Sequence, residues 1–210
     1  MQQSSPSDSS DRAYWRRLIR GRRRALSAAE QHAASLALCQ RLLALPECQQ
    51  ATRIGLYLAN DGELDLAPLA KALWARGYQL FLPVLHPFAP GHLLMLGYHR
   101  NSPLRPNRFG IPEPHLDVRE VAPLTNLDLL LCPLVAFDTA GNRLGMGGGF
   151  YDRTLARWHQ SQGSRPQPIG IAHDCQQVDA LPHALWDVPF TQILTPSQHY
   201  HFPLNGRQQG

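Results

Sequence analysis

The sequence predicts an α/β fold in which a mostly parallel, twisted sheet is flanked by helices, forming a single three-layer domain. Apolar runs of strand length alternate with helix-like segments from residue 53 onward, which is typical of parallel sheets with helical crossovers. The run NLDLLLCPLVAFD (126–138) is apolar at most positions, as expected for a strand buried on both faces. A chain of 210 residues is long enough to form one well-packed core.

The domain is expected to span residues 11–205. Residues 1–10 are polar and rich in serine, a composition that predicts a disordered N-terminal tail. Residues 206–210 are expected to form a C-terminal tail. No internal repeat is present in the sequence.

Two helices are expected at the start of the domain, a basic one over residues 11–26 and a second one over 27–45. Ser27 and Glu30 have the spacing of a capping box, which marks the start of the second helix. Pro46 ends it, because proline does not continue a helix. One side of the first helix carries Tyr14, Leu18 and Ile19, and the second helix offers Leu36, Leu38, Leu42 and Leu43 to the core.

Strands and helices then alternate up to residue 196. Strands are expected at 53–59, 78–85, 92–99, 126–138, 168–173 and 190–196. Helices are expected at 66–77, where Gly77 closes the helix, and at 151–160. The proline-rich segment 103–123 is interpreted as a long ordered loop.

Composition favours a cytoplasmic, reduced chain without a membrane partner. The four cysteines have neither CxxC nor zinc-site spacing, which fits a reducing compartment. The N-terminus is polar and no stretch reaches the roughly 18 apolar residues of a membrane span. The net charge is +4 and Lys71 is the only lysine, so arginine supplies nearly all positive charge and suits phosphate or carboxylate contacts. So modest a charge does not predict a nucleic-acid partner.

A glycine-rich turn, NRLGMGGGFYDRTL (142–155), is the main functional motif. Four glycines lie within Gly145–Gly149, between an apolar run and a helix. A helix N-terminus offers unpaired N–H groups to anions, and glycines let that backbone approach closely. The turn lacks the Gly-Lys-Ser/Thr of a P-loop, and Phe150 replaces the third glycine of a dinucleotide fingerprint. Arg143 adds a bidentate donor for phosphate.

Asp152 lies in the first turn of the helix that follows the glycines. A carboxylate there interacts favourably with the helix dipole. It can equally serve as a Mg²⁺ ligand beside bound phosphates, because Mg²⁺ is usually held by one or two carboxylates plus phosphate oxygens. The residues alone leave both interpretations open.

The run GNRLGMGGGFYDRTL resembles the signature of the 5-formyltetrahydrofolate cyclo-ligase family. The resemblance extends to RRRALS, LYLANDGELD, NRFGIPEP and the tail GIAHDCQQVDALPHALWDVPFTQILTP. It implies an ATP-driven cyclisation of 5-formyltetrahydrofolate to 5,10-methenyltetrahydrofolate, with Mg²⁺ as cofactor and with release of ADP and phosphate. In that scheme the formyl oxygen attacks the γ-phosphate, and N10 of the folate then displaces the phosphate.

The resemblance also implies roles for individual residues. Arg12 and Arg16 would reach the ATP phosphates, and Asp152 and Asp187 would hold Mg²⁺. The nucleotide loop would consist of Arg143, Leu144, Gly145, Met146, Gly147, Gly148, Gly149, Phe150 and Tyr151, of which Arg143, Phe150 and Tyr151 would act at the reaction centre. The folate would contact Leu58, Glu63, Phe109, Met146, Gly147, Gly148, Gly149 and Phe150. Some members carry lysine where this chain has Gly148, so arginines would replace that charge here.

Two other functions fit parts of the sequence. An ATP-dependent kinase or ligase acting on another small molecule would use the same glycine-rich turn. An RNA-binding or regulatory module would use the arginine-rich segment 12–24, but that function leaves the glycines unexplained. We expect a monomer that acts on small molecules.

Overall fold

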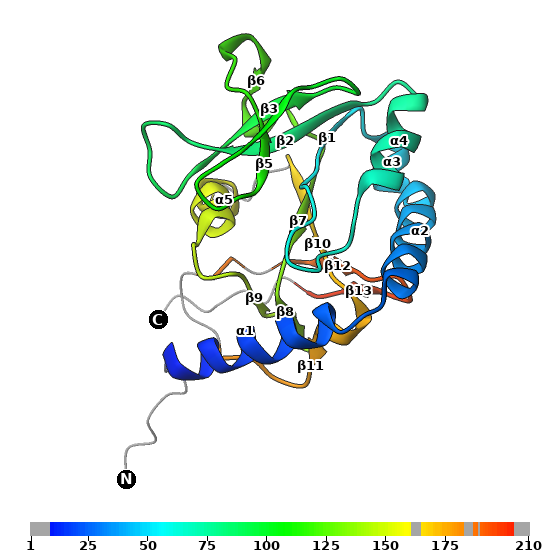
Figure 1. The fold of residues 1–210 in the computed structure, drawn as a ribbon, viewed down its shortest axis with the longest axis vertical. Helices are drawn as coiled ribbons and strands as arrows, with labels where there is room; N and C mark the ends of the chain where they lie inside the picture. Colours follow the sequence, from blue (N-terminus) through cyan, green and yellow to red (C-terminus); the bar gives the residue numbers. More distant parts are fainter. Residues whose placement is uncertain (1–8, 161–164, 183–186, 189, 204–210) are drawn as a thin grey trace.

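An eight-stranded sheet forms the middle layer of the protein (Figure 1). The computed structural model describes residues 9–160, 165–182, 187–188 and 190–203. The order across the sheet is β13 (His199–His201), β12 (Gln192–Leu194), β10 (Gln167–Ile171), β7 (Leu129–Pro133), β1 (Arg53–Gly55), β2 (Gln79–Leu85), β3 (Leu93–Tyr98) and β6 (Val121–Ala122). The strands from β12 to β2 run parallel, and the outer strands β13, β3 and β6 pair antiparallel. The predicted α/β fold is confirmed.

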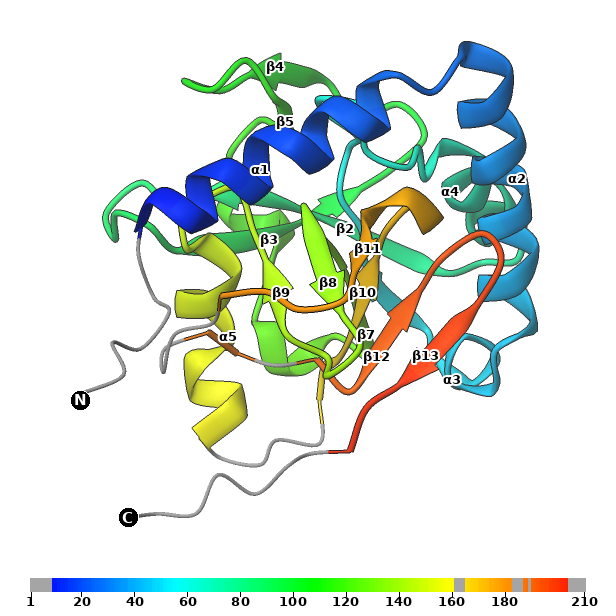
Figure 2. The ribbon, with the colours of Figure 1, turned by 90° about the horizontal axis from the view of Figure 1, so that it is seen from below.

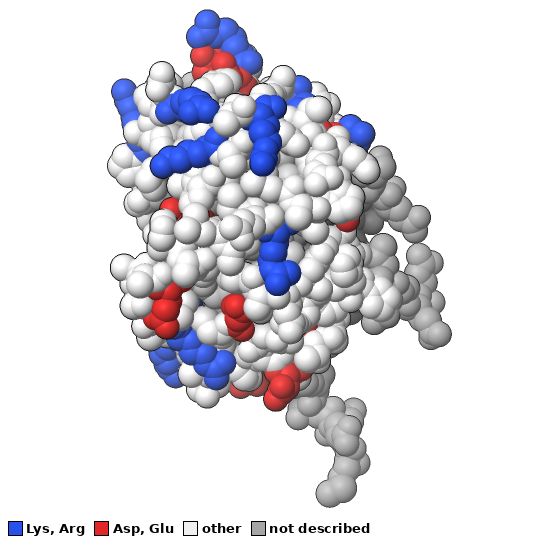
Figure 3. Space-filling model, turned by 90° about the vertical axis from the view of Figure 1, so that its right-hand side faces the viewer, with Lys and Arg blue, Asp and Glu red and all other residues white. Residues whose placement is uncertain are grey.

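Helices cover both faces of this sheet. On one face lie α2 (Ala28–Ala44), α3 (Pro46–Gln50) and α4 (Ala67–Ala75), and on the other lies α5 (Phe150–Gln160) (Figure 1). The basic helix α1 (Ser9–Arg24) crosses one end of the molecule, over the strands β8 (Ala136–Asp138) and β9 (Arg143–Leu144) (Figure 2). On the side that carries α2 and α4, charged side chains of both signs are separated by uncharged surface (Figure 3).

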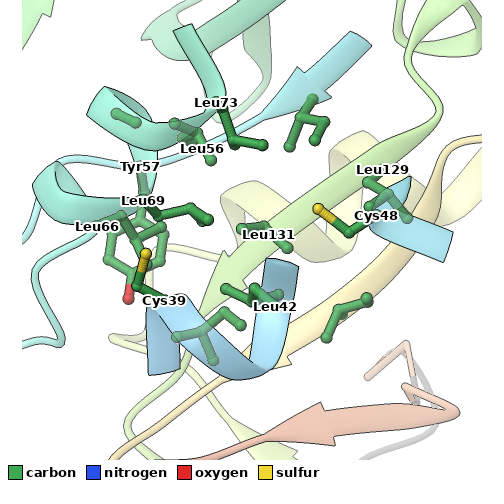
Figure 4. Close-up of a cluster of buried hydrophobic side chains, with 14 of the residues drawn as sticks. Cys39, Leu42, Cys48, Leu56, Tyr57, Leu66, Leu69, Leu73, Leu129 and Leu131 are labelled. Atoms are coloured by element: carbon green, nitrogen blue, oxygen red, sulfur yellow. The ribbon is translucent and has the colours of Figure 1, made fainter. Parts of the chain in front are cut away.

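Strand β7 is buried on both faces, as its continuous apolar run predicts. Leu129 and Leu131 pack into the cluster that contains Leu42 of α2 and Leu73 of α4 (Figure 4). Leu130 packs into a second cluster on the opposite side, with Leu155 of α5. Successive side chains of a strand point to opposite faces, so this one strand links the two cores.

The start of α2 follows from its cap. The Ser27 backbone N–H donates to Glu30 Oε2 over 2.8 Å, and the Glu30 N–H donates to Ser27 Oγ over 3.3 Å, so the predicted capping box is confirmed. Helix α2 ends at Ala44, and Pro46 begins the short helix α3, where a proline is tolerated because the first helical N–H has no partner. Leu36 was a predicted core residue, but it is exposed.

The predicted strand 126–138 is wrong in one respect, because it forms two strands of different sheets. Strand β7 ends at Pro133, and β8 joins a separate three-stranded sheet with β9 and β11 (Gln177–Val178). Proline has no N–H group to continue a ladder. At the break, Gln176 Nε2 donates to the carbonyl oxygens of Leu134 and Val135 over 2.7 and 2.9 Å.

Three other boundaries differ from the predictions. The segment 103–123 is not only a loop, because it contains the hairpin β4 (Leu104–Pro106) and β5 (Pro112–Pro114) and the edge strand β6. The predicted strand 53–59 is paired only in β1. Helix α1 begins at Ser9, inside the predicted N-terminal tail; the rest of that tail and residues 206–210 lie outside the described residues. Within the part of the chain that the structure describes, no helix is long and apolar enough to cross a membrane.

Candidate functional site

A cavity of about 650 Å³ opens at the carboxyl ends of β1, β2 and β7. Its walls come from the turn after β1, the end of β2, the β4–β5 hairpin and the glycine loop, which we define as Gly145–Gly149. Open α/β sheets bind ligands at this edge, because the loops that follow parallel strands gather there. The cavity is therefore the candidate functional site.

Most of the predicted site residues line this cavity: Leu58, Glu63, Phe109, Arg143, Gly145, Met146, Gly148, Gly149, Phe150, Tyr151 and Asp152. Arg16 lies directly behind the loop, where its Nε donates to the Gly145 carbonyl over 2.8 Å, and Gly147 faces its guanidinium. Arg12 and Asp187 lie together as an ion pair. Leu144 is fully buried with Ile19 of α1 and Val135, so its side chain serves packing.

The glycines make room for the protein's own side chains as well as for a ligand. A Cβ atom on Gly147, whose φ is +99°, would lie 3.3 Å from Arg16 Cζ, and one on Gly148 would lie 2.6 Å from the Phe150 ring. A Cβ on Gly145 would meet no atom within 4 Å. Gly145 therefore leaves open space beside the cavity, whereas Gly147 and Gly148 are required by packing.

The backbone N–H groups of the glycine loop are available to a ligand. Among the described residues, no hydrogen-bond acceptor faces the N–H of Met146, Gly147, Gly148 or Gly149. The loop leads into the N-terminus of α5, whose first N–H groups also have no intrahelical partner. Such a row of free donors at a helix start favours an anion.

Two arginine–aspartate pairs lie beside the loop. Arg12 donates to both carboxylate oxygens of Asp187 over 2.7 and 3.0 Å. Arg143 pairs with Asp152, donates to the Val188 carbonyl over 2.9 Å and lies 4.2 Å from the centre of the Phe190 ring. The hydrogen bond to Asp187 raises the pKa of Arg12. Arg143 is thus held in the protein interior, where it positions Asp152.

Glu63 lies on the wall of the cavity opposite in character to the glycine loop, because it offers a carboxyl group and not backbone N–H groups. Its side chain is 13% exposed and its Oε1 lies 3.8 Å from Arg23 Nη2. The Asn60 N–H donates to Oε2 over 3.1 Å. Burial raises the pKa of Glu63 to about 7, although Arg23 and the Asn60 N–H act in the opposite direction.

Arg23 and Asp61 support this turn, although neither was predicted from the sequence to belong to the site. Arg23 is fully buried and donates to the Asp61 carbonyl over 2.8 Å and to Asp61 Oδ2 over 2.9 Å. Arg20 and Arg24 also bind the Asp61 carboxylate. Partial burial of Asp61 acts to raise its pKa, but the three arginines outweigh this effect and lower the pKa to about 2. Their spacing of three and four residues on one helix face was the available signal.

Aromatic rings form part of the cavity wall beside the glycine loop. Phe109 is 53% exposed and packs edge-to-face against Phe150, with 5.9 Å between ring centres. The Arg108 guanidinium lies 4.9 Å from the Phe109 ring. A ring this exposed offers a free surface on which a flat ligand can stack.

The fold and the cavity together define an α/β protein with a small-molecule site, which has backbone donors on one wall and the Glu63 carboxyl group on another. More particularly, the chain belongs to the 5-formyltetrahydrofolate cyclo-ligase family, whose sequence profile matches residues 8–196. It is an enzyme of this family.

Relatives match most of the chain. The 5-formyltetrahydrofolate cyclo-ligase of Escherichia coli K12 is 50% identical over 181 residues, covering 86% of this chain and 98% of the relative. The enzyme of the same name from Haemophilus influenzae is 49% identical over 176 residues, covering 84% and 92%. The solved structure of Aquifex aeolicus 5,10-methenyltetrahydrofolate synthetase superposes with a TM-score of 0.78 at 29% identity, covering 95% of this chain and 96% of that one.

Proposed function

We propose that this enzyme cyclises 5-formyltetrahydrofolate to 5,10-methenyltetrahydrofolate, using ATP and Mg²⁺ and releasing ADP and phosphate. The observation that carries the proposal is that two unlike walls share one cavity. The glycine loop offers free N–H donors, and Glu63 offers a buried carboxylate. A reaction with one phosphate-bearing substrate and one ring system rich in N–H groups needs both. The names of the relatives from E. coli and H. influenzae agree with this activity.

The chemistry requires activation of the formyl oxygen. The formyl group on N5 is an amide, so N10 cannot displace its oxygen directly. Transfer of the γ-phosphoryl group of ATP to that oxygen releases ADP and creates a phosphate leaving group. N10 then attacks the formyl carbon, loses its proton and expels inorganic phosphate, which leaves the one-carbon bridge between N5 and N10.

The chain supplies positioning and charge for this transfer and no covalent nucleophile, as is usual in phosphoryl transfer. Arg12, Arg16 and the loop N–H groups would hold the phosphates, and Arg143, Phe150 and Tyr151 would surround the reacting groups. Asp152 and Asp187 would hold Mg²⁺; two carboxylates fit this ion when phosphate oxygens complete its ligands. When bound, Mg²⁺ supplies positive charge that offsets the charge on the transferred group.

Glu63 and the aromatic wall would hold the folate. The Glu63 carboxylate can accept paired hydrogen bonds from a ring N–H and the amino group of the pterin. Leu58 lines the same part of the cavity and Phe109 offers a ring for stacking. Met146, Gly147, Gly148, Gly149 and Phe150 would lie between the two substrates. We further propose that the enzyme acts as a monomer in the cytoplasm, without a nucleic-acid or membrane partner.

Absorbance tests the activity directly. Purified protein with ATP, Mg²⁺ and 5-formyltetrahydrofolate should produce the near-ultraviolet band of the methenyl product, and omission of ATP should abolish it. Absence of the band with ATP present would contradict the proposal. ATP consumption in the presence of another small molecule would instead support a kinase or ligase that acts on that molecule. Salt-sensitive RNA binding that does not depend on ATP would support an RNA-binding or regulatory module.

A variant of Glu63 tests whether the two walls of the cavity bind different substrates. Glu63→Ala should raise the KM for folate by about tenfold or more, because it removes the paired hydrogen bonds to the pterin, while the KM for ATP changes little. Glu120→Ala is the matched control, since Glu120 pairs with His99 away from this cavity. A defect confined to ATP would overturn the assignment of Glu63.

A further inference from the structure

Arg153, in the first turn of α5, connects two loops that are far apart in the sequence. Its Nε donates to the Gly91 carbonyl over 2.9 Å, and its Nη2 donates to the Gly148 carbonyl. Gly91 lies in the turn between β2 and β3, whereas Gly148 belongs to the glycine loop. The guanidinium also lies 5.8 Å from the centre of the Phe150 ring. One side chain thus fixes the glycine loop to the turn between β2 and β3.

The surrounding backbone leaves space for this guanidinium. A Cβ on Gly91, whose φ is +84°, would lie 2.4 Å from Arg153 Nε, and a Cβ on Gly149, whose φ is +62°, would lie 2.9 Å from Nη1. Real Cβ atoms do not approach so closely, so any other residue at either position would displace the arginine. The two glycines and the arginine therefore form one structural unit.

The contact to Gly148 determines where the next N–H group points. A trans peptide group is planar, so the C=O of Gly148 and the N–H of Gly149 point in opposite directions. Arg16 orients the Met146 N–H in the same way, because its Nε donates to the Gly145 carbonyl over 2.8 Å. Gly145, Met146, Gly148 and Gly149 line the cavity, whereas Arg16 and Arg153 do not. The arginines hold the carbonyl groups on the outer side of the loop, which directs these N–H groups to the cavity side.

We propose that Arg153 is a positioning residue for the nucleotide: by holding the Gly148 carbonyl it orients the Gly149 N–H toward a phosphate oxygen. It acts through the backbone and does not contact the substrate. The inference rests on the proposed function, because it assigns the anion of the loop to ATP. It would also give a loop with Gly148, and without lysine, an oriented N–H donor for phosphate.

The first test is Arg153→Met, measured as the Kd for ADP by calorimetry and as the KM values for ATP and 5-formyltetrahydrofolate. We expect the Kd for ADP and the KM for ATP to rise by about tenfold, the effect of losing one charge-assisted hydrogen bond. The KM for folate should change less than threefold. Arg153→Lys retains a donor but not the planar fork that spans two carbonyl groups, so it should recover only part of the affinity.

Arg41→Met is the matched control. Arg41 is another exposed arginine that donates to two carbonyl oxygens, those of Pro196 and Ser197, and it lies outside the cavity. It should lower the Tm about as much as Arg153→Met does and leave nucleotide affinity unchanged. Nucleotide affinity of Arg153→Met within twofold of wild type would overturn the proposal. An equal loss for both substrates, or a loss that Arg41→Met reproduces, would also overturn it, because either indicates general destabilisation.

A double-mutant cycle gives a second, independent test. Gly91→Ala should expel the Arg153 guanidinium and raise the Kd for ADP by a similar factor. When combined with Arg153→Met it should add less than twofold, because both changes break the same contact. Additive effects would overturn the proposed route through Gly91. The near-ultraviolet assay of the wild type separately tests the proposed function, so the two failures can be distinguished.

Discussion

The two walls of the cavity are built in opposite ways. At the glycine loop, arginines of α1 and α5 hold backbone carbonyl groups and leave the N–H groups free. At the turn Asn60–Glu63, the fully buried Arg23 holds a carbonyl and the carboxylate of Asp61, and Glu63 faces the cavity. In both places arginines shape the backbone of a loop. The group offered to a ligand is a backbone N–H donor at one wall and the Glu63 carboxyl group at the other.

This difference indicates how each wall responds to substitution. The turn depends on arginines that bind the Asp61 carboxylate and carbonyl, so loss of the fully buried Arg23 breaks part of a buried charged network. The glycine loop depends on backbone shape, so addition of a methyl group is the damaging change. Substitutions in the two walls therefore test this contrast.

Loss of Arg23 should have the largest effect. Arg23→Met should lower the free energy of unfolding by about 3–5 kcal/mol. The Asp61 carboxylate then keeps only the more exposed Arg20 and Arg24, and the Asp61 carbonyl loses its donor. Urea denaturation measures the change. The neighbouring Arg22 is exposed, and Arg22→Met should change stability by less than about 0.5 kcal/mol. Equal effects of the two variants would contradict the role of buried charge in this turn.

The pH dependence of stability tests Glu63. Burial raises its pKa from 4.5 to about 7 in the folded protein, so between these values the native state binds more protons than the unfolded state. The free energy of unfolding should therefore decrease as pH rises through this window, by about 3 kcal/mol at most. Glu63→Gln should remove this decrease, as measured by denaturation without ligands at pH 4.5 to 8.

Glu120→Gln is the control for removal of one carboxylate outside the cavity. It should retain the decrease seen in the wild type. If Glu63→Gln and the wild type show the same pH dependence, the Glu63 carboxylate is not destabilised by its surroundings.

Two glycine substitutions give the smallest effect and separate shape from ligand access. Gly147→Ala should cost about 1–2 kcal/mol of stability, because its positive φ disfavours a side chain and the Cβ would press on Arg16. Gly145→Ala should leave stability within about 0.5 kcal/mol, since no atom lies near its Cβ, while raising the KM for ATP. Thermal unfolding and ATP kinetics of the two variants provide the measurement, and the reverse order of stabilities would contradict it.

Local patterns predicted much of the fold and part of the site. The capping box at Ser27, the buried run of β7 and the glycine-rich turn each depend on neighbouring residues, and the structure has all three. The division of 126–138 into two strands was missed, because the carbonyl groups at the break are satisfied by Gln176 from a distant segment. Periodicity cannot predict such a partner.

In the candidate site, too, some residues were predicted from the sequence and others were not. Resemblance to the family led to Arg16, Glu63 and the glycine loop, and the structure brings them to one cavity or directly behind it. Arg23 and Arg153 were missed, although both lie in recognised motifs. A run of arginines reads as a solvated basic face, and only burial distinguishes Arg23 from its neighbours.

The sequence by itself determined the α/β class and the position of the clustered glycines, because these depend on composition and short-range order. The family followed from the resemblance of its motifs to those of known members. Only the tertiary structure decided which arginine meets which carbonyl group: Arg16 meets Gly145 across 129 residues, and Arg23 meets Leu134 across 111. An arginine can donate to any acceptor that folding brings within reach. Its role is therefore set by the packing of helices and strands around it and not by its place in the chain.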